Sequence, residues 1–356
     1  RFGKWLEGAR DWSISRNRFW GTPIPVWKSD NPKFPRVDVF GSIAEIKEKT
    51  GIEVTNLHKP YIDDVVYPNP DDPSGKTMMR RVGDVFDCWF ESGSMPYAQV
   101  HYPFDNKEWF ENHFPADFIV EAMDQTRGWF YTLTVLSTAL HNKPAFKNCI
   151  CTGLLMAEGG QKLSKRLKNY PDPNEVLDNI GSDALRWFLV SSPVLKGGNL
   201  AVDKEGKEIA KAARVAQIPL WNAFYFFTLY ANAEGYKAKE ISSSAEAIDN
   251  YILSKLKRLR DVVKQGLESY DVSMATGEVA SFMEILNNWY IRRTRDRFWE
   301  GDAQAFDTLY TVLVNVAKIT APLMPFVSEY IFKNLTGEES VHLTDYPALG
   351  GINPDE

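Results

Sequence analysis

Two lysines stand three residues apart in the segment KLSKR, as Lys162 and Lys165. A lysine ammonium is a compact charge on a flexible stem, so this pair could follow phosphate oxygens whose charge changes during a reaction. After this pair, a helix is predicted to begin: Asp172 is suited to its N-cap and Pro173 to its first position. Glu175, three residues after Asp172, could complete a capping box. These residues predict an anchored cationic loop for a polyphosphate, although spacing alone favours an ordinary solvated basic turn.

A second polar group, Glu121, Asp124 and Gln125, stands at the end of a strand predicted over residues 118–122. Open α/β sheets bind ligands at the carboxyl ends of their strands. The acceptor oxygens of these side chains suit ribose hydroxyls and a substrate ammonium group. Asp124 would also serve as the N-cap of the helix predicted over residues 125–140.

The chain has a net charge of −6, which gives no overall attraction to nucleic acid, but its cations are clustered. Clusters within residues 204–214 and 255–260 are interpreted as ordinary solvated helix faces. A third cluster differs, because Trp289, Arg292 and Arg293 combine an aromatic ring with two guanidinium groups on one predicted helix. Unstacked RNA bases need this combination. A role limited to pairing with nearby carboxylates is the alternative.

The secondary structure predicted around these residues differs between the two parts of the sequence. Up to residue 192, short β-rich runs alternate with helical patterns, which indicates an α/β fold with parallel strands and crossover helices. Residues 28–81 are rich in Pro, Asp and Gly and are interpreted as an insertion packed on the sheet. A further strand is expected over residues 148–156, before the lysine loop at 162–166, and a short helix over residues 182–191.

After a connector at residues 193–205, the signals from residue 206 to 356 are helical. Apolar residues recur every three or four positions, which predicts an all-α helical bundle. Its clearest helices are expected over residues 248–267, 303–320 and 326–335, the last two ended by Pro322 and Gly337.

Composition narrows the class of protein. With 44% hydrophobic and 25% charged residues the chain is in the globular range. Cys88, Cys149 and Cys151 form no C-x-x-C pair, so neither a disulfide framework nor a zinc ribbon is predicted and no protein metal site is expected. No apolar run is long enough for a membrane span. A cytoplasmic protein is the expectation.

Five segments, taken together, resemble class I aminoacyl-tRNA synthetases, and the isoleucine enzymes among them in particular. They are KLSKR, similar to the KMSKS signature, and, listed with their first residues, DWSISRNRFWGTPIPVW from Asp11, DVFDCWFESGSMPYAQ from Asp84, EAMDQTRGWF from Glu121 and NNWYIRRTRDRFW from Asn287. The resemblance covers nearly the whole chain. It implies the second half of a Rossmann-like catalytic domain (1–192), followed by a helical anticodon-binding domain (206–356).

The resemblance implies a ligase that uses ATP and Mg²⁺ to activate isoleucine and then transfers it to the isoleucine tRNA. Such chemistry depends on positioning and on neutralising charge on the leaving phosphates, so it needs no protein nucleophile. Lys162 and Lys165 would take that role, and Arg166 stands where the family usually has Ser. Lys165, Glu121, Asp124 and Gln125 would bind ATP or the adenylate. Ala122 stands where a Gly is usual.

Trp20 and Trp129 would form the walls of the amino-acid pocket, because the matching positions flank the substrate in isoleucine enzymes. Taken singly, a tryptophan is more often part of a core. Apolar walls separate isoleucine from valine only weakly, and this pair of amino acids is the standard example of that limit.

Two features of the family are not found in the sequence: a HIGH-type motif and an editing domain. None of the five histidines forms an H-x-x-H pair. The expectation is therefore a piece of a longer enzyme, inactive by itself. A valine enzyme and a non-catalytic tRNA-binding paralogue remain the alternatives, although the DQTRGW segment favours isoleucine.

Overall fold

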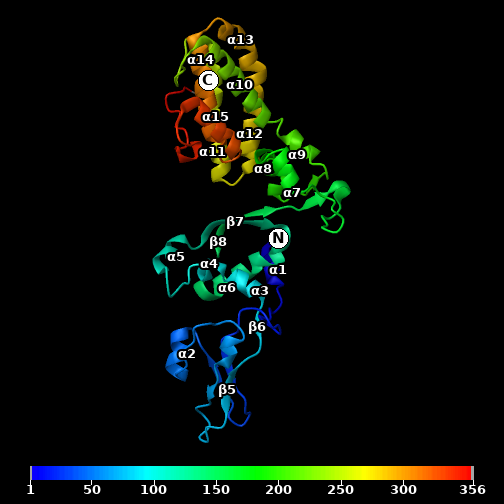
Figure 1. Cartoon of the computed structure of the whole chain (residues 1–356), viewed down its shortest axis with the longest axis vertical. Coiled ribbons are helices and arrows are strands. Elements are labelled where there is room, and N and C mark those ends of the chain that lie inside the picture. Colours follow the sequence, from blue (N-terminus) through cyan, green and yellow to red (C-terminus); the bar gives the residue numbers. More distant parts are fainter. Residues whose placement is uncertain (1, 354–356) are drawn as a thin grey trace. The chain divides into compact units, whose positions relative to one another are not determined.

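The computed structural model describes residues 2–353, which divide into two compact units. The first unit comprises residues 1–119 and 124–149, and the second comprises residues 120–123 and 150–356. Figure 1 shows the elements of each. No helix among residues 2–353 combines the length and the apolar composition that crossing a membrane requires.

The first unit holds short strands and helices. In chain order they are α1 (Phe2–Glu7), β1 (Ser15–Arg16), β2 (Val26–Ser29), β3 (Val37–Val39), α2 (Ile43–Thr50), the 3-10 helix η1 (Tyr61–Asp64), β4 (Tyr67–Pro68), β5 (Met78–Arg81), β6 (Val85–Phe86), α3 (Cys88–Gly93), α4 (Met95–Ala98), α5 (Lys107–His113), β7 (Ala116–Ala122), the 3-10 helix η2 (Met123–Arg127), α6 (Trp129–His141) and β8 (Phe146–Thr152). Strands β7 and β8 pair with each other and continue into the second unit.

The segment expected as an insertion has its own sheet and core. Its strands are antiparallel in the order β3-β2-β5-β4, and Trp27 lies opposite both Asp38 and Arg81. Trp27 is fully buried with Phe40, Ile46 and Met79, and its indole N–H donates to the Val65 carbonyl at 2.7 Å. The segment therefore folds around a central tryptophan.

The second unit begins with a small α/β part and continues into the helical bundle. Its elements are β9 (Leu155–Ala157), η3 (Glu158–Gly160), α7 (Pro173–Asn179), α8 (Ser182–Val190), η4 (Pro193–Lys196), β10 (Leu200–Val202), α9 (Lys207–Ala212), α10 (Gln217–Glu234), α11 (Ala247–Glu268), α12 (Val272–Glu284), the π-helix η5 (Ile285–Ile291), α13 (Arg292–Trp299), α14 (Ala303–Thr320), α15 (Pro325–Thr336) and η6 (Val341–Leu343). Strands β9 and β10 are parallel.

The predicted α/β fold class followed by a helical bundle is confirmed. Helices α10–α15 share one hydrophobic core, in which α11 packs against α12 and α14 (Figure 1). Leu256 and Leu259 of α11 and Val312 and Val316 of α14 are fully buried in it. The apolar period of three to four residues thus faces the interior, as expected for packed amphipathic helices.

The strand expected over residues 148–156 is in fact two strands, β8 and β9, separated at Gly153. A Cβ atom at this glycine would lie 1.9 Å from the Gly198 carbonyl oxygen. The Gly153 amide donates instead to the Val194 carbonyl at 2.8 Å. Two backbone segments therefore meet where only glycine fits, and this interrupts the pairing.

Candidate functional site

The lysine loop has a fixed backbone and free charges. Its Asn169 side chain bridges the loop, accepting from the Ser164 amide at 2.9 Å and donating to the Lys162 carbonyl at 3.1 Å. Lys162 also bridges to Met156 of β9. The Lys162 and Lys165 side chains are exposed and pair with no carboxylate among residues 2–353. The loop is thus prepared for an anionic ligand from outside.

The predicted helix start behind this loop is present at α7. The Asp172 carboxylate accepts from the Asn174 amide at 2.8 Å, and Pro173 occupies the first turn. Within the described chain, no bond from Glu175 completes a capping box. The N-cap prediction is confirmed, whereas the reciprocal bond is absent.

Gln125 fixes the start of α6, a role that Asp124 was expected to play. Its Oε1 accepts from the Trp129 amide at 3.1 Å, while Asp124 is exposed in η2 and Gly128 precedes the helix. The prediction of Asp124 as the N-cap is wrong, because the chain forms a 3-10 turn before the α-helix begins. Gly128 is buried between Gln125 and Trp89, where a Cβ would lie 2.6 Å from Gln125 Oε1.

The candidate ligand residues are described in two separate units. Asp124, Gln125, Trp20 and Trp129 belong to the first, whereas Glu121 lies exposed near the end of β7 in the second, together with the lysine loop.

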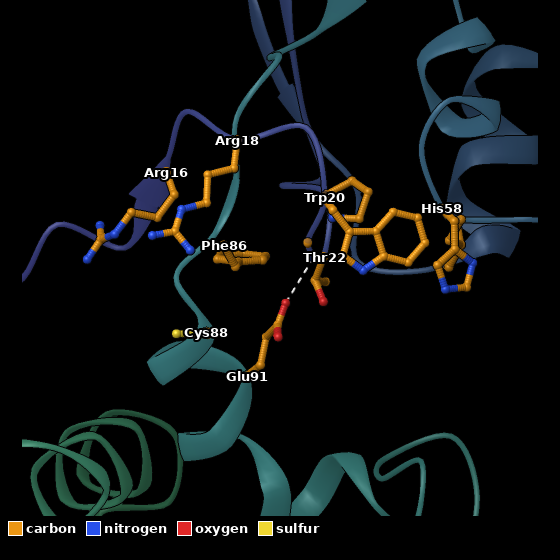
Figure 2. A pocket seen from close by; sticks show the side chains of 11 residues that line it. Arg16, Arg18, Trp20, Thr22, His58, Phe86, Cys88 and Glu91 are labelled. Carbon is orange, nitrogen blue, oxygen red and sulfur yellow. Dashed lines mark hydrogen bonds between the residues drawn. The ribbon is translucent and has the colours of Figure 1, made fainter. Parts of the chain in front are cut away.

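Trp20 lines a cavity of about 430 Å³ in the first unit (Figure 2). The residue is 68% exposed, and its ring stacks on His58 with ring centroids 6.0 Å apart and an interplanar angle of 14°. Arg16 and Arg18 lie on the other side of Phe86 (Figure 2). Further lining residues are Gly21, Thr22, Pro23, Leu57, Cys88 and Glu91. An apolar wall with cations at the far end suits an amphipathic anion.

Trp129 is not among the residues that line this cavity. Its indole N–H donates to the Ser92 carbonyl at 3.0 Å. Ser92 is a neighbour of Glu91 on α3. Helix α3, for which the sequence predicted no role, therefore accepts a hydrogen bond from Trp129 through Ser92 and lines the Trp20 cavity through Glu91.

Asp87 organises the start of α3 and one arginine of the cavity. It accepts from the Trp12 indole at 2.9 Å and from Arg16 Nη2 at 2.8 Å, and it caps α3 through the Trp89 amide at 3.3 Å. Burial raises the pKa of this carboxyl, but the hydrogen bonds and Arg16 outweigh burial and the net pKa is lowered. Asp87 thus stays charged and fixes Arg16.

The predicted RNA-binding residues lie where η5 passes into α13. Trp289 is half-buried against Tyr251, with centroids 4.6 Å apart, and the Arg293 guanidinium lies 5.4 Å from its ring centroid. Arg292 and Arg293 are exposed and form no ion pair within the described part of the chain. The alternative of pairing with nearby carboxylates is therefore not observed. Arg297 instead pairs with Asp249 and Asp302.

Two parts of the sequence match models of known protein families. Residues 1–201 match the model for tRNA synthetases class I (I, L, M and V), and residues 249–353 match the model for the anticodon-binding domain of tRNA ligases. The chain belongs to the class I tRNA synthetases. The predicted family membership is confirmed. The lysine loop, Trp20 and Trp129 lie within the first match, and Trp289 lies within the second.

Curated relatives of this synthetase chain are named isoleucine–tRNA ligases. The chain is 56% identical over 348 residues to the ligase of Mycobacterium tuberculosis strain H37Rv, which covers 98% of this chain and 33% of the relative. For Rickettsia conorii the identity is 59% over 339 residues, covering 94% and 31%. The chain thus spans about a third of the length of the relatives it matches.

Solved structures support the class I synthetase fold. The leucyl-tRNA synthetase of an Agrobacterium radiobacter K84 ternary complex matches with a TM-score of 0.72 at 18% identity, over 97% of this chain and 43% of that one. The methionyl-tRNA synthetase of Mycobacterium tuberculosis matches with a TM-score of 0.66 at 17% identity, over 93% and 56%.

Proposed function

We propose that this chain forms part of an isoleucine–tRNA ligase, which activates isoleucine with ATP and transfers it to the isoleucine tRNA in the cytoplasm. One observation carries the proposal: identity of 55–59% to curated isoleucine–tRNA ligases over 94–100% of the chain. The candidate sites described above are compatible with the chemistry.

In the first step, an isoleucine carboxylate oxygen attacks the α-phosphorus of ATP, and the bond from that phosphorus to pyrophosphate breaks. In the second, a terminal ribose hydroxyl of the tRNA attacks the acyl carbon and AMP leaves. Lys162 and Lys165 neutralise the charge that grows on the leaving pyrophosphate, which selectively stabilises the transition state. Arg166, exposed in the same loop, adds a third cation.

Mg²⁺ belongs to the substrate in this account, bound to the phosphates of ATP. Among residues 2–353 there is no group of three or more histidines, cysteines or acidic residues that could hold a metal ion. Lys162, Lys165 and Arg166 supply the protein's charges for phosphate binding.

Adenylate binding is assigned to Glu121, Asp124 and Gln125, and amino-acid binding to Trp20 and Trp129. Since Gln125 Oε1 accepts from the Trp129 amide, its amide nitrogen stays available to donate to a ligand. Glu121 and Asp124 are exposed and supply carboxylates. Trp20 is assigned an apolar wall for the branched side chain, and Trp129 a second apolar contact from outside the cavity that Trp20 lines.

tRNA binding is assigned to Trp289, Arg292 and Arg293. This surface lies within the match to the anticodon-binding domain. Two unpaired guanidinium groups beside an aromatic ring favour phosphates and unstacked bases.

A chimera tests the function. The matching 348-residue segment of the Mycobacterium tuberculosis isoleucine–tRNA ligase is replaced by this chain, and ATP–pyrophosphate exchange is measured with isoleucine, with valine and without amino acid. We expect exchange that depends on isoleucine and prefers it to valine. A preference for valine would assign the chain to the valine enzymes. A folded, tRNA-binding chimera without exchange would indicate the non-catalytic paralogue.

A further inference from the structure

We propose that Glu91, which anchors the backbone at Thr22, and His58, which stacks on the indole, are positioning residues for Trp20 and so set the width of the cavity that Trp20 lines. The link to isoleucine selection rests on the proposed function. The positioning itself rests only on contacts within the first unit.

Trp20 needs external support because its own segment supplies little. It lies between β1 and β2, outside regular secondary structure, and Phe19 and Trp20 are 75% and 68% exposed. Gly21 follows with φ of 147°, and a Cβ atom there would lie 2.8 Å from the Val85 side chain. The segment thus passes close to β6, but nothing in it fixes the indole.

Glu91 provides the first support. Its Oε1 accepts a hydrogen bond from the Thr22 amide at 2.9 Å, which ties the Trp20 segment to α3 (Figure 2). Helix α3 is itself held against α6, since a Cβ atom at the buried Gly93 would lie 2.9 Å from Leu136. The adjacent Ser92 carbonyl receives the Trp129 indole N–H. One short helix thus connects the supports of both tryptophans.

His58 provides the second support, from the inserted segment. Asn56 Oδ1 accepts from the His58 amide at 3.0 Å and lies 2.8 Å from Nδ1, so a proton on Nδ1 orients the ring. The oriented ring stacks on Trp20. Next to it, Lys59 Nζ lies 5.9 Å from the Phe19 ring centroid and donates to the Gly83 carbonyl at 2.8 Å.

These contacts leave one face of the Trp20 indole against His58 while the residue still lines the cavity. Loss of either support would let the indole rotate and widen the cavity. Isoleucine and valine differ by only one methylene group, and an apolar wall distinguishes them through its contact with that group. A small displacement of the wall should therefore reduce the preference for isoleucine over valine.

Hydrogen exchange of the chain tests the positioning without any activity. Glu91→Ala should accelerate exchange of the Thr22 amide several-fold, because its acceptor is removed. Glu91→Gln retains an acceptor oxygen and should restore slow exchange. Glu108→Ala is the control, because Glu108 is an exposed carboxylate of the same unit. Unchanged Thr22 exchange in Glu91→Ala, at an unchanged melting temperature, would overturn the proposal.

Kinetics of the chimera test the consequence. His58→Ala and Glu91→Ala should raise KM for isoleucine several-fold and lower the isoleucine-to-valine ratio of kcat/KM, with little change in kcat. His58→Phe keeps a ring for stacking and should restore the ratio. An unchanged ratio in both alanine variants would refute the link to selection. A chimera without any exchange would refute the proposed function, while the hydrogen-exchange result still decides the positioning.

Discussion

Asp249 and Arg297 form a two-pronged ion pair inside the helical bundle, with Nη1–Oδ1 and Nη2–Oδ2 distances of 2.9 Å each. Asp249 is fully buried near the start of α11 and also accepts from the Tyr290 hydroxyl at 2.8 Å. Burial, followed by the charge of Asp249, raises the pKa of Tyr290, so that hydroxyl remains a donor. Asp249 of α11 thus binds both Arg297 of α13 and Tyr290 of the π-helix η5. These two helices carry the candidate RNA-binding residues.

Removing the buried carboxylate should therefore destabilise the bundle. Asp249→Ala leaves the Tyr290 hydroxyl and the two Nη groups of Arg297 without their acceptor, while Arg297 Nε keeps Asp302. We expect a loss of about 3 kcal/mol in the free energy of unfolding. This expected loss is at the low end of the range for breaking a buried ion pair, because 20% of the Arg297 side chain is exposed to solvent. Urea unfolding checks it, with Asp296→Ala, an exposed carboxylate of α13, as the control. Equal stability of the two variants would contradict the assignment.

A second buried carboxylate, Asp183, acts as a cap between helices distant in sequence. It lies at the start of α8 and accepts from the Val327 amide at 2.7 Å and the Phe326 amide at 3.4 Å, in the first turn of α15. Asp183→Ala should cost about 1–2 kcal/mol, as loss of a helix cap does. Asp183→Asn retains an acceptor and should lose less. Thermal unfolding of both variants measures the difference, and an equal loss would argue against capping.

The regular helices were predictable, whereas the contacts between distant segments were not. Helix α14 has the bounds expected from its apolar period, because packing and propensity agree there. By contrast, Arg297 belongs to a run of arginines in the sequence, and only the fold shows that it pairs with Asp249, 48 positions away.

The same holds for the candidate site. Lys162 and Lys165 stood out by their spacing, but Asn169 closes the loop through two bonds that no motif announced. His58 is remote from Trp20 in sequence and gave no signal, since its contact exists only once the inserted sheet has folded.

Acid should weaken the inserted segment through Asp72. Hydrogen bonds from Thr77 and Ser74 hold the pKa of this carboxyl well below its usual range. The folded chain keeps Asp72 charged while the unfolded chain binds a proton near pH 4, roughly its ordinary pKa. The contribution is complete above the unfolded pKa and falls as the pH drops through the folded one.

The stability difference between the wild-type chain and Asp72→Asn should accordingly shrink as the pH is lowered from 7 to about 3. Urea unfolding at each pH measures it. A difference that does not change with pH would show that the charge of Asp72 has no part in stability.

RNA binding should depend on the two unpaired arginines of α13. If Arg292 and Arg293 each neutralise one phosphate, the Arg292→Ala/Arg293→Ala variant should bind an isoleucine-tRNA anticodon stem-loop more weakly. The slope of log affinity against log salt should become shallower by about 1.4, twice the single-strand value. Fluorescence anisotropy over a salt series measures both.

The control for this experiment is Lys237→Ala/Lys239→Ala, which removes two exposed charges after α10. It should leave the salt slope nearly unchanged. If the arginine variant binds as tightly as the wild type but melts at a lower temperature, these arginines stabilise the bundle and do not contact RNA.

On the proposed function, we expect the lysine loop of this chain to stabilise the transition state of adenylate formation. Isoleucine-dependent ATP–pyrophosphate exchange by the chimera with Lys165→Ala tests this expectation, beside Lys168→Asn two residues after the loop. Asparagine is the control substitution because Lys168 has a positive φ of 45°, which asparagine tolerates. We predict that Lys165→Ala lowers kcat about 100- to 1,000-fold, as removal of one transition-state donor does, with little change in KM for isoleucine, and that Lys168→Asn stays near wild type. Exchange by Lys165→Ala within about twofold of wild type, far below the predicted loss, would show that Lys165 does not act on the transition state.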